Sequence, residues 1–405
     1  MISRLAVFGA TGDLTARYLL PALAALRAAG ATDDKLELIA VGREDWSTPQ
    51  FRDWAADQLD RHAGHLPAGV RSVISSAARY RMADVTDPAS VAAAIAGDGI
   101  APDSAVACYL ALPPAVFPHA VAALRDAGLP EGSTIVLEKP FGEDLASAIE
   151  LNRQLARTLP ERAVFRVDHF LAMTTVQNLL GTRLANRVFE SIWNSAHIAE
   201  VDIVWEESLA LEGRAAYYDG VGALKDMLQN HLLQLLCLVA MEPPISLDER
   251  DLRDRKVDVL RSVRPLSGPD IDRTTCRGQY TAGRIGTREV PAYAEEDGVD
   301  PAHHTETFAE MELRLDNWRW PDTVFRLRTG KALARDRKEV SVRFRDVPHL
   351  PFAHHQQAAP NLLRFGLEPE TVSLDLTGVG PRAQALSPMS LEGQLQPAEL
   401  PAYAQ

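Results

Sequence analysis

Short apolar segments alternate with amphipathic segments over the first 170 residues. A run at 5–8 precedes a glycine turn, after which leucines recur at the spacing of one helix face. Further strand-like runs lie at 36–41, 105–112, 134–137 and 163–167, and helical patterns lie at 116–127 and 145–159. This alternation predicts a Rossmann-like, doubly wound parallel α/β sheet that forms a dinucleotide-binding domain over residues 1–170.

The alternation stops after residue 177. Helical patterns lie at 176–189 and 221–241, and strand-like patterns lie at 198–206, 308–315, 324–328 and 339–344. No helical pattern separates the last three strands. We therefore predict a C-terminal α+β domain over residues 171–405 with a large, mainly antiparallel sheet, which would serve substrate binding and oligomerisation. The tail from Gly378 is expected to be the least structured part.

Charge and composition narrow the class of protein. The 405 residues contain 42 Lys and Arg against 55 Asp and Glu, a net charge of −13, which argues against nucleic acid or an anionic membrane as a partner. The longest apolar stretch, 232–241, is about half the ~20 residues that a membrane span needs. The cysteines Cys108, Cys237 and Cys276 lack metal-ligand or CxxC spacing, so we expect a soluble, cytoplasmic protein without a metal site.

The glycine turn is the first candidate for chemistry. In a doubly wound sheet the ligand lies beyond the carboxyl ends of the strands, where a glycine turn and a helix N-terminus can bind a pyrophosphate. An ordinary strand-to-helix turn is the alternative, but a turn after the first strand favours a nucleotide site. The residues expected to contact the cofactor here are Gly9, Thr11, Gly12, Asp13 and Leu14, and Pro113 and Lys139 fall at other strand ends.

Arg43 follows the second strand of this domain, where a cation can meet the 2'-phosphate of NADP. An NAD enzyme usually has an acid at this place. Glu44 and Asp45 follow directly, so the sequence favours NADP and leaves NAD use open.

Three further positions carry ionisable groups in unusual settings. Asp168 and His169 adjoin at a strand end, and His231 lies in an apolar helical run with Asp226 and Asn230 at helical spacing. The plainer interpretations are a strand-end ion pair, a core histidine and, for Lys139, a solvated turn residue. Spacing alone does not join these signals.

Longer motifs place these ionisable residues in one family pattern. They are GATGDL at 9–14, EKPFG at 138–142, RVDHFL at 166–171, VQNL at 176–179, ANR at 185–187, EGR at 212–214, DMLQNHLLQ at 226–234, DNWRW at 316–320 and RTGK at 328–331. In these motifs and in their order, the chain resembles the glucose-6-phosphate dehydrogenase family along nearly its whole length.

The resemblance implies an NADP-dependent oxidation of C1 of glucose 6-phosphate or a related aldose to the lactone. His231 matches the general base of the family, and Asp168 matches the carboxylate that orients it. An imidazole titrates near neutrality, and a neighbouring carboxylate stabilises its charged form, which suits this role.

The resemblance also assigns the binding residues. Lys139 matches the lysine between sugar and cofactor, and Arg43 the contact to the 2'-phosphate. The remaining matches to substrate-binding positions are His169, Glu207, Asp226 and Lys331. The sheet-to-sheet association of the family implies a homodimer or homotetramer, although this chain stops at Gln405, about where the family continues through a further helix and strand.

Three positions depart from the family pattern. Met173 replaces the lysine that clamps the 6-phosphate, Phe170 cannot donate the hydrogen bond that a tyrosine would, and Ala16 replaces a lysine of the glycine turn. One lost charge-assisted contact costs about 1.5–3 kcal/mol. Two alternatives follow: the same chemistry on a sugar without the phosphate or with a different substituent, and a non-catalytic paralogue that binds nucleotide.

Overall fold

The computed structural model describes residues 4–32, 36–96, 104–142, 144–352, 358–380, 385–395, 400 and 402–404. The chain divides into two compact units. The first unit comprises Met1–Ala172 and Ala398–Gln405, and the second comprises Met173–Pro397.

The first unit is built on a parallel sheet. Its described residues form the strands β1 (Arg4–Phe8), β2 (Glu37–Gly42), β3 (Ala78–Met82), β4 (Ala107–Leu110), β5 (Thr134–Glu138) and β6 (Val164–Val167). Their order in the sheet is β3-β2-β1-β4-β5-β6, and every neighbouring pair is parallel. The predicted Rossmann-like fold is confirmed, and all strand ends that were expected to carry site residues lie at one edge of this sheet.

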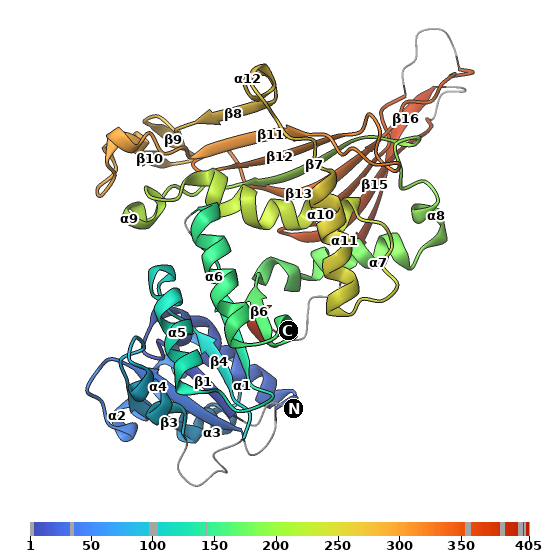
Figure 1. The fold of residues 1–405 in the computed structure, drawn as a ribbon. Helices are drawn as coiled ribbons and strands as arrows, with labels where there is room; N and C mark the ends of the chain where they lie inside the picture. Colours follow the sequence, from blue (N-terminus) through green and yellow to red (C-terminus); the bar gives the residue numbers. More distant parts are fainter. Residues whose placement is uncertain are drawn as a thin grey trace. The chain divides into compact units, whose positions relative to one another are not determined.

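Helices cover both faces of the sheet (Figure 1). Side chains of a strand point alternately to the two faces. Ala6 and Phe8 belong to a buried cluster with α4 (Pro88–Ile95), α5 (Phe117–Ala127) and α6 (Leu145–Thr158). Val7 belongs to the opposite cluster, with α1 (Leu20–Ala28), α2 (Thr48–His62) and α3 (Ala68–Ala77). The continuous apolar run of β1 reflects this double burial.

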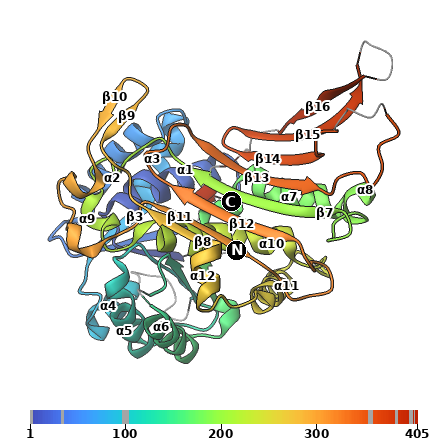
Figure 2. The same ribbon diagram turned by 90° about the horizontal axis from the view of Figure 1, so that it is seen from above.

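The second unit contains the larger sheet. Among its described residues, eight strands pair in the order β16-β15-β14-β13-β7-β12-β11-β8, as Figure 2 shows from above. These strands are β7 (Ile198–Glu206), β8 (Thr275–Gly278), β11 (Phe308–Leu313), β12 (Val324–Gly330), β13 (Arg337–Phe344), β14 (Leu362–Leu367), β15 (Glu370–Val379) and β16 (Leu386–Gln394). Apart from the parallel pair β7 and β12, the neighbours in this described sheet are antiparallel, which confirms the predicted architecture.

The two faces of this sheet differ in character. Val201 and Ile203 of β7 are fully buried. The α- and π-helices among the described residues of this unit are α7 (Thr174–Leu184), α8 (Arg187–Glu190), α9 (Ala215–Tyr218), the π-helix η5 (Leu224–Leu232), α10 (Leu233–Ala240), α11 (Glu249–Ser262) and α12 (Pro269–Thr274). The π-helix η5 contacts both β7 and β12. The alternate residues Glu200 and Asp202 instead pair with Arg326 of β12, at 2.6 and 3.0 Å. A small hairpin of β9 (Gly283–Ile285) and β10 (Arg288–Val290) completes the unit.

The expectation for the tail from Gly378 is wrong for residues 386–394, whereas residues 381–384, 396–399, 401 and 405 lie outside the described residues. Strand β15 continues through Val379, and β16 pairs with it along its length. Exposed Ser, Glu and Gln hide the strand pattern here, because pairing with a neighbouring strand satisfies the backbone whatever the side chains are. Among the helices that the structure describes, none is long and apolar enough to span a bilayer.

Candidate functional site

The glycine turn after β1 is shaped by two neighbouring strand ends. Gly9 has φ of +84°, and a Cβ at this position would lie 2.2 Å from the carbonyl oxygen of Ala111, just after β4. The amides of Gly9 and Ala10 donate to the carbonyl of Val41 in β2, at 2.9 and 3.0 Å. Only glycine fits this conformation and this close approach. The turn is therefore tied to β2 and β4 and leaves no room for a side chain at Gly9.

The remaining turn residues differ in exposure. Gly12 and Asp13 are exposed, and the Asp13 carboxylate lies 3.5 Å from Arg17 one helical turn later. Leu14 packs against a buried cluster and precedes a short π-helix, η1 (Thr15–Leu19). Pro113 follows β4 and begins a turn in which its carbonyl accepts the amide of Val116 at 2.9 Å.

Thr11 and the end of β2 are joined through a carboxylate. The Thr11 hydroxyl donates to Oε2 of Glu44 at 2.9 Å, and the Tyr80 hydroxyl lies 3.3 Å from the same oxygen and 2.8 Å from the Glu44 carbonyl. Burial acts to raise the pKa of Glu44, but backbone hydrogen bonds and those from Thr11 and Tyr80 outweigh it and lower the pKa below its ordinary value. Arg43, the adjacent residue, is exposed. Tyr80 was not predicted as a site residue, because strand β3, which bears it, was not predicted.

Lys139 and Asp168 follow neighbouring strands. β5 and β6 are paired with Glu138 opposite Val167, so the next residues occupy adjacent strand ends. The Tyr109 hydroxyl donates a hydrogen bond to Glu138. Burial raises the pKa of Glu138 against the lowering effect of that bond, and the charge of Asp168 raises it while that of Lys139 lowers it. The three ionisable groups thus lie within electrostatic reach of one another.

His169 contacts an aromatic ring from the far end of the chain. Oδ1 of Asp168 accepts the amide of Phe170 at 3.0 Å, which fixes the carboxylate at the start of a single turn, η4 (His169–Ala172). The His169 ring stacks on Tyr403 of η8 (Ala402–Ala404), with centroids 5.8 Å apart and 16° between the planes. Burial, and then the charge of Glu138, raises the pKa of Tyr403. Tyr403 was not predicted, because no periodic pattern surrounds it.

In the second unit, Glu207 and Lys331 form an ion pair. Glu207 directly follows β7 and Lys331 directly follows β12, and these strands are parallel neighbours. Nζ of Lys331 lies 2.7 Å from Oε2 of Glu207, with about a fifth of each side chain exposed. The same Nζ lies 5.6 Å from the ring centre of Tyr218. The fold therefore brings together two predicted substrate-binding residues that are 124 positions apart.

The predicted polar helix is a π-helix, η5 (Leu224–Leu232). In a π-helix hydrogen bonds run from i to i+5, so residues five apart, such as Asp226 and His231, follow each other by one turn. His231 is 1% exposed. The Tyr217 hydroxyl donates to Oδ1 of Asp226 at 3.3 Å, and burial, followed by the Asp226 charge, raises the pKa of Tyr217 to about 12. The side-chain amide Nδ2 of Asn230 donates to the backbone carbonyl of Lys225 at 2.6 Å.

The three residues that depart from the family pattern are apolar, and each is buried or half-buried. Phe170 is 5% exposed and Ala16 is 6% exposed. Met173 is half-buried and precedes α7 without a side-chain cap. None of these three side chains can donate a hydrogen bond to a phosphate.

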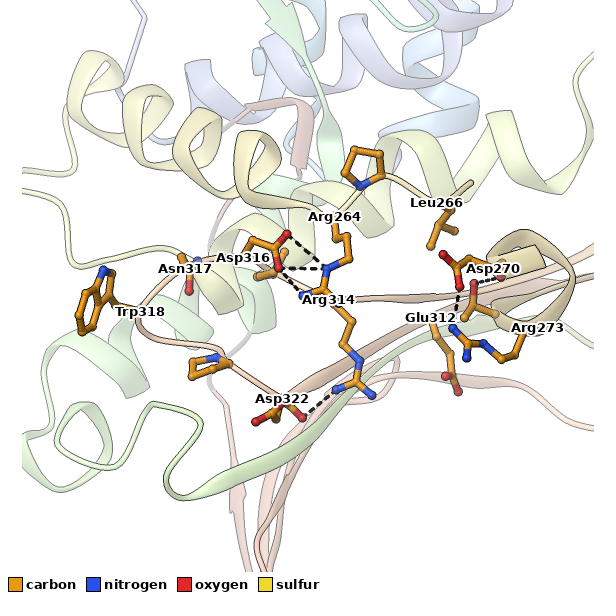
Figure 3. A pocket seen from close by; sticks show the side chains of 14 residues that line it. Arg264, Leu266, Asp270, Arg273, Glu312, Arg314, Asp316, Asn317, Trp318 and Asp322 are labelled. Atoms are coloured by element: carbon orange, nitrogen blue, oxygen red, sulfur yellow. Dashed lines mark hydrogen bonds and ion pairs between the residues drawn. The ribbon is translucent and has the colours of Figure 1, made fainter. Parts of the chain in front are cut away.

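An open pocket of about 910 Å³ lies elsewhere in the second unit (Figure 3). It is lined by residues of α12 and β11, of the segment before α12 and of the turn after β11. Some of the charged lining residues pair with each other, such as Arg264 with Asp316 at 2.6 Å. No predicted site residue is among its lining residues. This pocket is therefore separate from the candidate site.

A parallel sheet whose first strand ends in a turn without room for a side chain at Gly9 is typical of a dinucleotide-binding domain. Two family models match the chain: "Glucose-6-phosphate dehydrogenase, NAD binding domain" over residues 6–178, and "Glucose-6-phosphate dehydrogenase, C-terminal domain" over residues 180–402. The chain belongs to the glucose-6-phosphate dehydrogenase family and is a sugar dehydrogenase.

Relatives and solved structures agree with this family. The chain is 40% identical to the glucose-6-phosphate 1-dehydrogenase of Zymomonas mobilis over 381 residues, which cover 93% of this chain and 78% of the relative. It is similar to the crystal structure of glucose-6-phosphate 1-dehydrogenase from Mycobacterium avium, with a TM-score of 0.87 and 32% identity over 100% of this chain and 85% of the other. A glucose-6-phosphate dehydrogenase in complex with its substrate glucose 6-phosphate matches with a TM-score of 0.88 and 28% identity, over 99% and 84% of the two chains.

Proposed function

We propose that this protein oxidises C1 of glucose 6-phosphate to the lactone with NADP as the hydride acceptor. The observation that carries the proposal is the similarity, over 99% of this chain, to a dehydrogenase in complex with glucose 6-phosphate. Relatives that are 40% identical to this chain are named glucose-6-phosphate 1-dehydrogenases, which supports the sugar phosphate as substrate. A nicotinamide, when bound, supplies the acceptor for the hydride.

The cofactor would be held by the first unit. Gly9 leaves the turn open for a close approach of a pyrophosphate, and Gly12 and Asp13 are exposed beside it. The exposed Arg43 would meet the 2'-phosphate of NADP, and Thr11, Leu14, Pro113 and Lys139 complete the proposed contacts. The fit rests on the absence of a side chain at Gly9, where a Cβ would collide with the backbone.

His231 would act as the general base that takes the proton from the C1 hydroxyl. The family resemblance pairs it with Asp168, whose carboxylate would stabilise the imidazolium. The hydrogen bond from the Phe170 amide supports this role, because it fixes the orientation of the Asp168 carboxylate.

The sugar hydroxyls would be bound by Glu207, Lys331, Asp226 and Lys139. The Glu207–Lys331 ion pair offers an acceptor and a donor to neighbouring hydroxyls. Tyr217 would hold Asp226 in place through the bond of 3.3 Å.

The second candidate is the same oxidation on a sugar without the 6-phosphate. Met173 and Phe170 favour it, because neither can donate to a phosphate, and of the predicted phosphate ligands His169 remains. The deciding experiment is kcat/KM for glucose 6-phosphate and for glucose, each with NADP and with NAD. A preference of at least about 100-fold for glucose 6-phosphate supports the first proposal, and an equal or greater kcat/KM for glucose supports the second.

We further propose that the domain boundary lies close to residue 170, a position supported by the division of the chain at Ala172. The oligomer would be a homodimer or homotetramer, as the family resemblance implies, and light scattering after size-exclusion chromatography tests this. The free thiols of Cys108, Cys237 and Cys276 support a cytoplasmic location.

A further inference from the structure

The side chain of Glu306 caps the π-helix η5, although the two are far apart in the sequence. Glu306 lies two residues before β11, and its Oε1 accepts the amide of Leu224, the first residue of η5, at 2.9 Å. Its backbone carbonyl accepts the amide of Ala223 at 3.0 Å. The first amides of a helix have no acceptor within the helix, so Glu306 supplies one. A carboxylate at this end also interacts favourably with the helix dipole.

The turn before η5 is shaped around this carboxylate. Gly222 has φ of +71°, and a Cβ there would lie 2.6 Å from Oε1 of Glu306 and 2.9 Å from its Cδ. Any other residue would strain the backbone and displace the carboxylate. Glu306 is half-buried, and both of its neighbours in the chain, Thr305 and Thr307, are buried. The carboxylate is therefore held against the start of the helix.

The two neighbours of Glu306 bond to other parts of the second unit that carry proposed sugar ligands. The Thr305 hydroxyl donates to the carbonyl of Asp219, the residue after α9, at 2.6 Å. The carbonyl of Thr307 accepts the backbone amide of Lys331, just after β12, at 2.9 Å. Three consecutive residues thus connect the end of α9, the start of η5 and the end of β12.

Tyr218 lies among the same groups. Burial, and then the charges of Asp226 and Glu306, raise the pKa of its phenol. Its ring centre lies 5.6 Å from Nζ of Lys331. The Glu306 carboxylate is therefore within electrostatic reach of a buried ring that contacts a proposed sugar ligand.

The position of η5 decides where two proposed site residues lie. Asp226 and His231 both belong to η5, and Asp226 comes two residues after the capped amide of Leu224. A shift of the start of η5 would move these two residues, whereas Lys331 is held separately through the carbonyl of residue 307.

We propose that Glu306 is a positioning residue of the sugar site, and that its carboxylate fixes η5 relative to Lys331. The inference rests on the proposed oxidation of a sugar and adds to it a residue that acts through the helix. Displacing a substrate-binding group by about 1 Å can lower the rate by about 100-fold, so a cap on this helix can matter to the reaction.

The test compares wild type, Glu306→Ala, Glu306→Gln and Asp87→Ala as full-length proteins. Glu306→Ala removes the acceptor, and Glu306→Gln keeps an acceptor without the charge. Asp87→Ala is the matched control, because the Asp87 carboxylate also caps a helix, α4 in the first unit.

Steady-state kinetics are measured with glucose 6-phosphate and with glucose. For the sugar that wild type prefers, we expect kcat/KM to fall by about 10-fold to 100-fold in Glu306→Ala and by less in Glu306→Gln, with KM for NADP within about 2-fold of wild type. Asp87→Ala should lower Tm and leave KM for the sugar within about 2-fold of wild type. Equal losses of kcat/KM in Glu306→Ala and Asp87→Ala would reduce Glu306 to a general role in folding.

Hydrogen–deuterium exchange tests the cap separately from activity. Glu306→Ala should speed exchange in peptides that cover residues 222–232 by about 10-fold or more, whereas Asp87→Ala should speed exchange in α4 instead. If wild type oxidises no sugar, the proposed function fails, and calorimetric binding of glucose 6-phosphate and glucose to wild type and Glu306→Ala still tests the position of η5. Unchanged exchange in η5, faster exchange with unchanged affinity and kcat/KM for the sugar, or a wild type that binds neither sugar would each overturn the positioning role.

Discussion

Nζ of Lys331 lies 2.7 Å from Oε2 of Glu207, which joins the carboxyl ends of two parallel strands in the second unit. About a fifth of each side chain is exposed, so water screens the pair only in part. The Lys331 ammonium has three N–H donors, so it can bind a second partner besides Glu207.

Lys331→Met should lower kcat/KM for the sugar by roughly 10-fold to 100-fold, since a charge-assisted bond to a hydroxyl contributes about 1.5–3 kcal/mol. Lys338→Met is the matched control, because Lys338 also pairs with a carboxylate, that of Glu368, outside the proposed site. Steady-state kinetics with varied sugar measures both variants. Equal losses in the two would mean that Lys331 acts only in folding.

Met173→Lys should restore a phosphate contact. We expect kcat/KM for glucose 6-phosphate to rise by about 10-fold, with that for glucose unchanged, because the new charge meets only the phosphate. Met173→Leu controls for the loss of the thioether. A rise for both sugars would contradict a role of this position in phosphate binding.

Gly9→Ala should weaken cofactor binding, because the new Cβ would lie 2.2 Å from a backbone oxygen and φ is +84°. We expect NADP affinity to fall by more than about 10-fold, and Tm to decrease, as backbone strain costs about 1–3 kcal/mol. Gly69→Ala, in helix α3 with open space around the new Cβ, should leave affinity unchanged and Tm equal or higher. Calorimetric titration and thermal unfolding check both, and unaltered affinity in Gly9→Ala would refute the assigned turn.

Tyr217 should make stability depend on alkaline pH. Folding raises its pKa from 10 to about 12, so the folded state favours the protonated phenol. Its contribution to the free energy of unfolding is therefore complete below pH 10 and decreases as the pH rises from about 10 to about 12. Urea unfolding at several pH values should show that the advantage of wild type over Tyr217→Phe shrinks across this window. A constant difference would show that folding does not raise the pKa of Tyr217, whether through burial or through Asp226.

The sequence predicted the elements whose own pattern is strong. Strand β7 matches its predicted range of 198–206, and the alternation of the first unit predicted the Rossmann-like sheet. The strands that were not predicted are β3, β8, β9, β10, β14, β15 and β16. In β3 and β16 charged or polar residues interrupt the pattern, and the tertiary fold sets their pairing partners.

The candidate site shows the same division. The family resemblance identified Glu207 and Lys331 one by one, but only the structure shows that they form an ion pair. Tyr80 and Glu44 are 36 residues apart, and Tyr403 and His169 are 234 residues apart. No local sequence pattern predicts these contacts. Long-range packing decides such contacts.

The central claim is that His231 is the base in the oxidation of a sugar at C1, and His231→Asn tests it most directly. Asparagine keeps a similar size in this buried position and cannot accept the proton. The measurement is kcat for reduction of NADP with saturating glucose 6-phosphate, with binding of NADP as the check on folding. We predict that kcat falls by about 100-fold to 10,000-fold while cofactor affinity is retained. A kcat close to that of wild type would contradict the account.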